Sequence, residues 1–256
     1  MSDHPAATPQ PRVPAAASNP HAPAATADLH APATAPDLHA PATTPDLHAP
    51  AATVRSRVRI PLRFGDGYEV EADVVTFHGL ADDQEHLAVV LGDPGPAPLV
   101  RLHSECLTGD VFGSARCDCG PQLREAVERI AERGGVLLYL RQEGRGIGLY
   151  NKLDAYALQD QGLDTYAANA ALGLPEDARD YTAAAQMLRA LGIGELDLLS
   201  NNPDKSDQLR ALGIAVRDRV PTGVFTTAHN VRYLRAKVLQ TQHTLPLAEL
   251  AERTAG

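Results

Sequence analysis

A nine-residue repeat near the N-terminus limits how much of this 256-residue chain can form a packed core. The unit at residues 28–36 recurs at 37–45 and returns with a changed ending at 46–54. Alanine, proline and threonine dominate the units, and 11 of the 20 prolines lie in residues 1–54. Such a segment has too little apolar surface to offset the entropy lost on ordering. We therefore expect residues 1–54 to form a disordered Ala/Pro-rich tail and residues 55–256 to form one folded domain.

The charge and hydropathy of the chain argue against two classes of partner. Its formal net charge is −9 at pH 7, so broad electrostatic binding to nucleic acid or to an anionic membrane is not expected. No run of 18 or more apolar residues is present, and the N-terminus lacks the features of a secretory signal. We expect a soluble cytoplasmic protein in which any phosphate site is a local cluster of arginine and lysine.

The periodicity of the remaining residues predicts hairpins first and alternating strands and helices afterwards. Strands are expected at 57–64, 68–77, 86–91, 99–103, 136–140, 196–199 and 214–217. Helices are expected at about 123–131, 151–161, 181–191, 205–212 and 231–240. Hairpins followed by strand–helix units favour a layered α/β/α domain with a mixed β-sheet.

All three cysteines of the chain lie within 14 residues, at Cys106, Cys117 and Cys119. Clustered thiolates are ligands that suit zinc. Three protein ligands with an open fourth position are typical of a catalytic zinc, whose bound water can become a nucleophile. Two other interpretations stay open, namely a closed structural zinc site with His103 as fourth ligand and a cluster without metal.

Two further segments follow predicted strands and carry groups that can hold phosphate. Residues 141–148 contain three glycines and two arginines, which suits a loop whose amides and guanidinium groups face an anion. The alternative for this segment is a surface turn with exposed arginines. Residues 200–205 place a hydroxyl group, a helix N-terminus and a lysine together, although an ordinary Asn-Pro turn that caps the helix is the alternative.

Taken together, these segments resemble the signatures of the GTP cyclohydrolase II family, in the same order. The resemblance covers residues 86–222 closely and is looser from 55 and up to 245, whereas the tail has no counterpart in it. The matching segments are 101–110, 114–120, 141–149 with 155–160, 177–181 and 200–205.

The resemblance implies a zinc enzyme that binds its metal through Cys106, Cys117 and Cys119. Such an enzyme converts GTP to 2,5-diamino-6-(5-phosphoribosylamino)pyrimidin-4(3H)-one, formate and diphosphate. It needs magnesium, feeds riboflavin biosynthesis and is usually a homodimer. The resemblance assigns the GTP site to Arg101, Leu102, His103, Ser104, Glu105, Gln122, Glu143, Gly144, Arg145, Thr165, Ser200 and Lys205. It also places Tyr156 beside the metal, Asp177 as proton acceptor and Arg179 as nucleophile towards the α-phosphate.

The residue types agree with this chemistry but leave several roles open. The carboxylate of Glu143 can accept hydrogen bonds from the N1–H and amino groups of guanine, or Glu143 can be a solvated loop residue. Tyr156 can orient water or the formyl intermediate, or it can pack in the core. Arg179 stays protonated in proteins, so stabilisation of the charged phosphoryl transition state is an alternative to nucleophilic attack.

Three departures from the family pattern leave the pathway open between riboflavin synthesis and a specialised paralogue. Ser200 stands where threonine is usual, Asp154 stands where a basic residue is frequent, and residues 240–243 differ from the usual ending.

Two other functions compete with the full reaction. One is ring opening alone, which would leave a formylamino product, and the presence of Tyr156 argues against it. The other is a non-catalytic, zinc-stabilised nucleotide-binding protein. The complete set of Asp177, Arg179 and Lys205 argues against that function, because a protein that only binds has no need of it.

Overall fold

The structure is a computed structural model that describes residues 51–175, 177–227 and 230. Most of the expected tail lies outside the described residues, as does the helix expected at 231–240. In the part of the chain that is described, no helix has the length and apolar character needed to cross a membrane.

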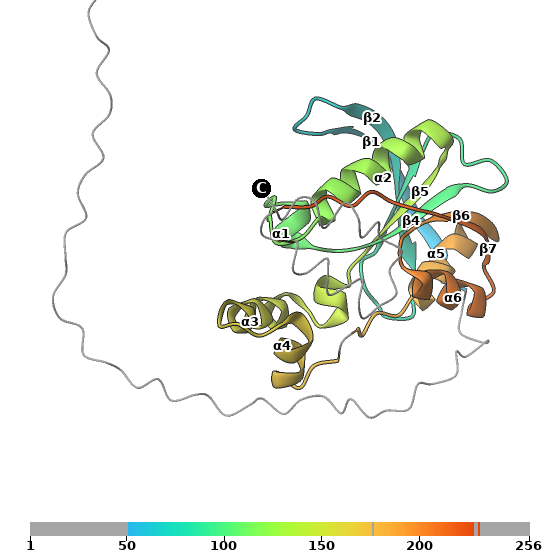
Figure 1. The fold of residues 1–256 in the computed structure, drawn as a ribbon. Coiled ribbons are helices and arrows are strands. Elements are labelled where there is room, and N and C mark those ends of the chain that lie inside the picture. The colour runs from blue at the N-terminus through green and yellow to red at the C-terminus, as the bar shows by residue number, and fades with distance from the viewer. Residues whose placement is uncertain (1–50, 176, 228–229, 231–256) are drawn as a thin grey trace, which may run out of the picture. The chain divides into compact units, whose positions relative to one another are not determined.

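A seven-stranded mixed sheet forms the centre of the domain (Figure 1). The strand order is β1-β2-β3-β5-β4-β6-β7. Neighbours from β1 to β5 pair antiparallel, whereas β5, β4, β6 and β7 pair in parallel. The strands are β1 (Thr53–Arg63), β2 (Glu69–His78), β3 (Leu87–Leu91), β4 (Leu99–Ser104), β5 (Gly135–Leu140), β6 (Glu195–Leu199) and β7 (Ala215–Val220). The predicted mixed sheet is confirmed, and each predicted strand is present.

The first strand begins earlier than the repeat pattern suggests. Thr53 and Val54 pair with His78 and Phe77 of β2, and Ala52 is buried in the hydrophobic core. These residues complete the last repeat unit and look like tail in the sequence. Thr53 and Val54 belong to the sheet because they pair with β2. Their local composition does not indicate this pairing.

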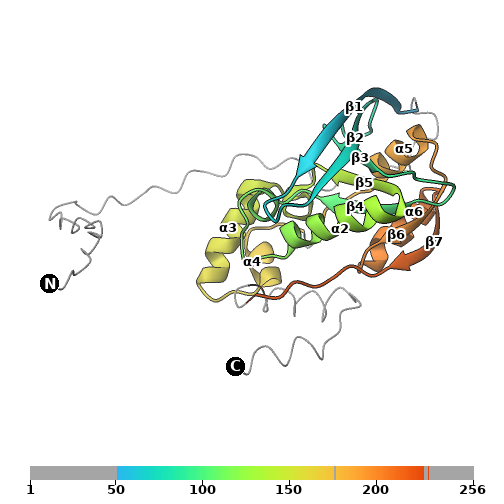
Figure 2. The same ribbon diagram turned by 90° about the horizontal axis from the view of Figure 1, so that it is seen from above.

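Helices cover both faces of the sheet, as Figure 2 shows. On one face α2 (Cys119–Arg133) packs its Ile130 in a cluster with Leu137 of β5. On the other face α5 (Thr182–Ala190) and α6 (Pro203–Ala211) pack in a cluster that contains Leu138. Successive residues of β5 alternate between the two clusters, as the two-residue period of a strand requires. The predicted α/β/α layering is therefore confirmed.

Three short elements were not predicted from the sequence. They are α1 (Leu107–Asp110), the 3-10 helix η1 (Glu143–Gly146) and α4 (Thr165–Ala171). Each has too few residues to show a helical period. Helix α3 (Leu149–Asp160) matches the helix expected at 151–161, and α3 and α4 lie together beyond one end of the sheet (Figure 1).

The interior strand β4 is the point at which the chain switches from adding strands on one side to adding them on the other. After β4 the chain adds β5 on one side, and it later adds β6 on the other side. Both pairings are parallel, so the carboxyl ends of these three strands lie at one edge. A crevice outside the carboxyl ends of strands at such a switch point is the usual ligand site of an open α/β sheet.

We expect that a shortened chain starting at Ala51 keeps the melting temperature and turnover of the full chain, because β1 and Ala52 stay intact. A chain starting at Arg59 loses Ala52 and half of the β1–β2 pairing. Its melting temperature should fall by about 2–4 °C for each kcal/mol of stability lost. Thermal unfolding followed by circular dichroism measures the melting temperature of each chain, and an activity assay measures turnover. A large loss in the chain from Ala51 would show that the repeat tail contributes to the fold or to the site.

Candidate metal centre and substrate pocket

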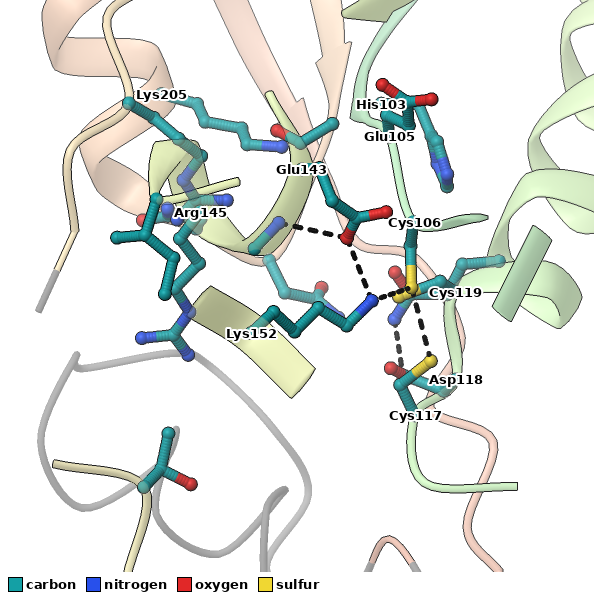
Figure 3. Close-up of a pocket in the computed structure, with 18 of the residues that line it drawn as sticks. His103, Glu105, Cys106, Cys117, Asp118, Cys119, Glu143, Arg145, Lys152 and Lys205 are labelled. Atoms are coloured by element: carbon teal, nitrogen blue, oxygen red, sulfur yellow. Dashed lines mark hydrogen bonds and ion pairs between the residues drawn. The ribbon is translucent and has the colours of Figure 1, made fainter. Parts of the chain in front are cut away.

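A pocket lies at the carboxyl ends of β4, β5 and β6 (Figure 3). It brings together residues from segments as far apart as β4 and α6. The predicted site residues that line it are Arg101, His103, Ser104, Glu105, Cys106, Cys117, Cys119, Gln122, Glu143, Gly144, Arg145, Tyr156, Thr165, Arg179, Ser200 and Lys205. Leu102 and Asp177 do not line it. Leu102 is buried in the core, and Asp177 forms an ion pair with the lining residue Arg179.

The three cysteine sulfurs converge at one end of the pocket. All three Sγ atoms lie within 4.8 Å of one another, and the Sγ atoms of Cys106 and Cys117 are 3.6 Å apart. Two sulfurs that each lie about 2.3 Å from a tetrahedral zinc are separated by about 3.8 Å. The number, type and spacing of these ligand atoms therefore fit zinc.

Interactions among the thiols of the cluster favour Cys106 as the first of them to lose its proton. Hydrogen bonds from the neighbouring thiols lower the pKa of Cys106, although burial opposes this. The same interaction with Cys106 raises the pKa of Cys117 to about 11. Zinc binding requires the remaining thiols to lose their protons as well, so metal uptake should release protons.

Gly109 allows the two cysteine segments to approach each other. A Cβ atom at Gly109 would lie 2.7 Å from Cys117 Sγ and 3.1 Å from Cys106 Sγ. The first distance is too short for non-bonded atoms and the second is tight, so a side chain at Gly109 would push the sulfurs of the cluster out of place. The sequence analysis did not single out this residue. Its position three residues after Cys106 was the available signal.

His103 binds a carboxylate instead of joining the cysteines. Its Nε2 lies 3.1 Å from Asp110 Oδ1. The Oδ2 atom of Asp110 accepts hydrogen bonds from the hydroxyl of Tyr139 at 2.9 Å and from the amide of Cys106 at 3.0 Å. Burial lowers the pKa of His103, and the nearby Asp110 only partly offsets this. Among the described residues the metal-binding group contains the three cysteines alone, which supports the open zinc site over the closed one.

Glu143 is held firmly beside the cysteine cluster. Its Oε2 accepts a hydrogen bond from the amide of Leu107 at 2.7 Å, and its Oε1 accepts one from the amide of Gly144 at 2.9 Å. Lys152 Nζ lies 2.8 Å from the same Oε1. These contacts argue against a solvated loop residue. A carboxylate offers about four lone-pair sites, so Glu143 has room for one further hydrogen bond at Oε2.

Lys152 is a residue of this site that the sequence analysis missed. It is only 8% exposed, and besides Glu143 it contacts Cys106 Sγ at 3.2 Å. It lies one helical turn before Tyr156 on α3, so the two side chains share a face of the helix. That spacing from a predicted site residue was the signal in the sequence. Tyr156 itself has the guanidinium of Arg116 4.9 Å from the centre of its ring.

The cationic side chains occupy a different part of the pocket. Figure 3 places Arg145 and Lys205 across from the cysteines. Lys205 is buried and donates a hydrogen bond to the carbonyl of Leu102 at 2.7 Å. Within the segment 200–205, Asn202 caps α6 by accepting a hydrogen bond from the amide of Asp204. The cap and the lysine in the pocket are both present, so the two interpretations of this segment are compatible.

Arg179 forms a two-pronged ion pair with Asp177. Its Nε donates to Asp177 Oδ1 at 2.8 Å, and a terminal nitrogen donates to Oδ2. Burial raises the pKa of Asp177, but the hydrogen bonds and charge of Arg179 outweigh it, so the pKa is lowered. The amide of Ala178 donates to the carbonyl of Arg145 at 3.0 Å. One backbone hydrogen bond thereby ties this segment to the glycine-rich turn.

The buried Arg101 and the half-buried Gln122 line the pocket and are hydrogen-bonded to each other. Arg101 donates to the carbonyl of Leu199 at 3.1 Å and to Gln122 Oε1 at 2.8 Å. Gln122 in turn donates to Asp118 Oδ2 at 2.6 Å. Burial lowers the pKa of Arg101, while the carboxylate of Asp118 opposes the shift. This chain links β4 to the loop that carries Cys117 and Cys119.

Comparison with known proteins gives a consistent result. The sequence profile described as GTP cyclohydrolase II matches residues 54–221. The GTP cyclohydrolase-2 of Vibrio cholerae serotype O1 is 51% identical over 194 residues, which cover 75% of this chain and 98% of that protein. The corresponding protein of Vibrio parahaemolyticus is 52% identical over 192 residues, covering 74% and 97%. Riboflavin biosynthesis protein RibBA of Bacillus velezensis is 55% identical over 168 residues, covering 64% of this chain and 42% of that protein.

The geometry predicts three zinc ligands from the protein. We expect His103→Ala to keep one zinc per chain, because His103 Nε2 is engaged by Asp110. Cys117→Ala should lose the zinc, because its Sγ belongs to the cluster. Metal analysis of the purified variants measures both. Loss of stoichiometric zinc in the His103 variant would favour the closed structural site.

Proposed function

The chain belongs to the GTP cyclohydrolase II family, and on this basis we propose that it hydrolyses GTP to 2,5-diamino-6-(5-phosphoribosylamino)pyrimidin-4(3H)-one, formate and diphosphate. The observation that carries the proposal is a pocket with a zinc-fitting cysteine cluster at one end and cationic side chains across from it. The two ends of the pocket match the two ends of GTP, where its reacting carbon C8 and its triphosphate lie.

The cysteine end would bind the guanine ring. Cys106, Cys117 and Cys119 would hold zinc, which when bound supplies activated water for hydrolysis at C8. Glu143 lies beside this cluster with one acceptor site open at Oε2. We expect that site to accept one hydrogen bond from the N1–H or amino group of guanine, rather than the two-bond fork suggested by the residue type alone.

The cationic end would bind the triphosphate. Arg145, Arg179 and Lys205 line the pocket and come from three separate segments. Arg145 and Lys205 lie across from the cysteines (Figure 3), and the residue before Arg179 is hydrogen-bonded to Arg145. Arginine and lysine are suited to phosphate oxygens, and magnesium would accompany the triphosphate as a counter-ion. The backbone hydrogen bond between Ala178 and Arg145 would hold two of these segments close together, so that both can contact the same substrate.

Arg179 is best suited to electrostatic stabilisation of the phosphoryl transition state. Its guanidinium is bound at two points by the ionised carboxylate of Asp177, and such an ion pair favours the protonated form. A protonated guanidinium lacks the lone pair that a nucleophile needs. In this arrangement Asp177 orients Arg179, and its lowered pKa makes it a weak general base.

Removal of the formyl group would complete the reaction at the same end of the pocket. Tyr156 lines the pocket, with Arg116 against its ring, so its hydroxyl can help to orient the formylated intermediate. The presence of Tyr156 in the pocket supports the proposal of the full reaction over ring opening alone. By analogy with the family, we further expect a homodimer in the cytoplasm and a role in riboflavin synthesis or a paralogous pathway.

Incubation of the zinc-loaded protein with GTP and magnesium should release formate and diphosphate in equal amounts. Chelation of the zinc should stop formate release, and added zinc should restore it. Enzymatic formate and diphosphate assays measure the two products. Absence of both would reject the proposal. Diphosphate and a formylated pyrimidine without free formate would select the ring-opening reaction instead.

The two hydrolyses should be separable by mutation, because they take place at opposite ends of the substrate. Cys119→Ser should abolish formate release while some diphosphate release persists, since a serine hydroxyl stays protonated where a thiol ionises. Arg179→Ala should slow diphosphate release by about 10²–10³-fold, by analogy with a removed oxyanion donor.

Formate release by the Arg179 variant then reports the order of steps. It continues if ring opening is independent, and it vanishes if phosphoryl transfer must come first. Circular dichroism serves as the control for folding. A folded Cys119→Ser variant that releases neither product would contradict separability.

A further inference from the structure

The ammonium group of Lys152 makes three contacts that use all of its donors. Lys152 Nζ lies 3.2 Å from Cys106 Sγ and 2.8 Å from Glu143 Oε1 (Figure 3). It also lies 3.0 Å from Thr108 Oγ1. A lysine ammonium has three N–H bonds, so each can have one partner here. The partners come from the segment that begins with Cys106 and from η1, whereas Lys152 itself lies on α3.

Burial of this charge needs compensation, and the neighbouring groups supply it. Lys152 is almost inaccessible to solvent, and an unpaired buried ammonium is strongly unfavourable. The carboxylate of Glu143 provides one partner of opposite charge. The cysteine cluster provides another, because a zinc ion bound by three thiolates keeps a net charge of −1. The ammonium group therefore offsets charge on both groups.

The position of Lys152 argues against a role in binding phosphate. Its contacts are on the cysteine side of the pocket, while Arg145 and Lys205 lie across from it (Figure 3). A phosphate group could reach Lys152 only by displacing partners that already use its donors. These contacts favour a role in which Lys152 acts through Cys106 and Glu143.

We propose that Lys152 is a positioning residue that couples the metal site to the guanine site. Its hydrogen bond to Cys106 Sγ would hold this ligand in place and offset the charge of the thiolates. Its ion pair with Glu143 would fix the carboxylate so that the open acceptor site at Oε2 faces the substrate. The part of this inference that concerns guanine rests on the proposed function, whereas the part that concerns the metal does not.

The metal part can be tested without any turnover. Lys152→Met removes the charge and keeps an unbranched apolar side chain, and Lys152→Arg keeps the charge in a different shape. Arg55→Met is the matched control, because it removes an equal charge from the exposed strand β1. Competition with a chromophoric chelator measures zinc affinity, and the sulfur-to-cobalt absorption band of the Co²⁺-loaded protein reports on the thiolates.

We expect Lys152→Met to weaken zinc binding by about 10–100-fold, as is usual when a partner of a metal ligand is lost. The cobalt band should shift in the same variant, and Arg55→Met should change neither property. Unchanged zinc affinity together with an unchanged cobalt band would overturn the proposal, whatever happens to turnover. If Lys152→Met does not fold, Lys152→Arg decides: a shifted band supports the contact with sulfur, and an unshifted band rejects it.

The guanine part can be tested by steady-state kinetics at saturating zinc. Loss of the ion pair with Glu143 should raise KM for GTP more in Lys152→Met than in Lys152→Arg. An unchanged KM in a folded, zinc-saturated Lys152→Met variant would reject this part. Because the zinc and cobalt measurements need no substrate, failure of the wild-type protein to hydrolyse GTP would be distinguishable from failure of this inference.

Discussion

The parallel pairing of β4 with both β5 and β6 determines where the functional segments of this protein meet. Because these three strands run parallel, the segments that follow them all begin at the same edge of the sheet. The segment after β4 carries Cys106, the segment after β5 carries Glu143, and the segment after β6 carries Lys205. The remaining site residues lie on β4 itself or reach the same edge from α2 and the loop before it, from α3 and α4, and from the approach to α5. The pocket is therefore a direct result of the sheet topology.

The distribution of charge in the pocket is the second organising feature. The cysteines, which become anionic when they bind metal, gather on one side, and Arg145 and Lys205 lie across from them. A chain with a net charge of −9 can hold a highly anionic substrate only through such local segregation. Lys152 lies on the thiolate side, where it pairs with Cys106 and Glu143. The buried Arg101 also lies near this side, where the charge of Asp118 acts on it.

The sequence predicted those parts of the structure that depend on local patterns. Strand periodicity predicted the sheet, and the close spacing of Cys106, Cys117 and Cys119 predicted the cysteine cluster. The sequence did not show which partner His103 would take. Asp110 lies seven residues later, at the end of α1, and only the fold brings its carboxylate to the His103 ring. The orientation of Glu143 likewise depends on the amide of Leu107, 36 residues earlier in the chain. Lys152 was missed because a single lysine in a helix looks like an ordinary surface residue until the fold buries it.

The close approach at Gly109 also limits how this gene can change over evolutionary time. Every substitution of glycine adds at least a Cβ atom, and here that atom would collide with the sulfur of Cys117 and crowd that of Cys106. No missense change of the Gly109 codon escapes this collision. Neighbouring positions such as the exposed Phe112 meet no comparable barrier. Purifying selection should therefore act on a residue that donates no ligand atom, and a screen of viable variants should find Gly109 as depleted as the cysteines themselves.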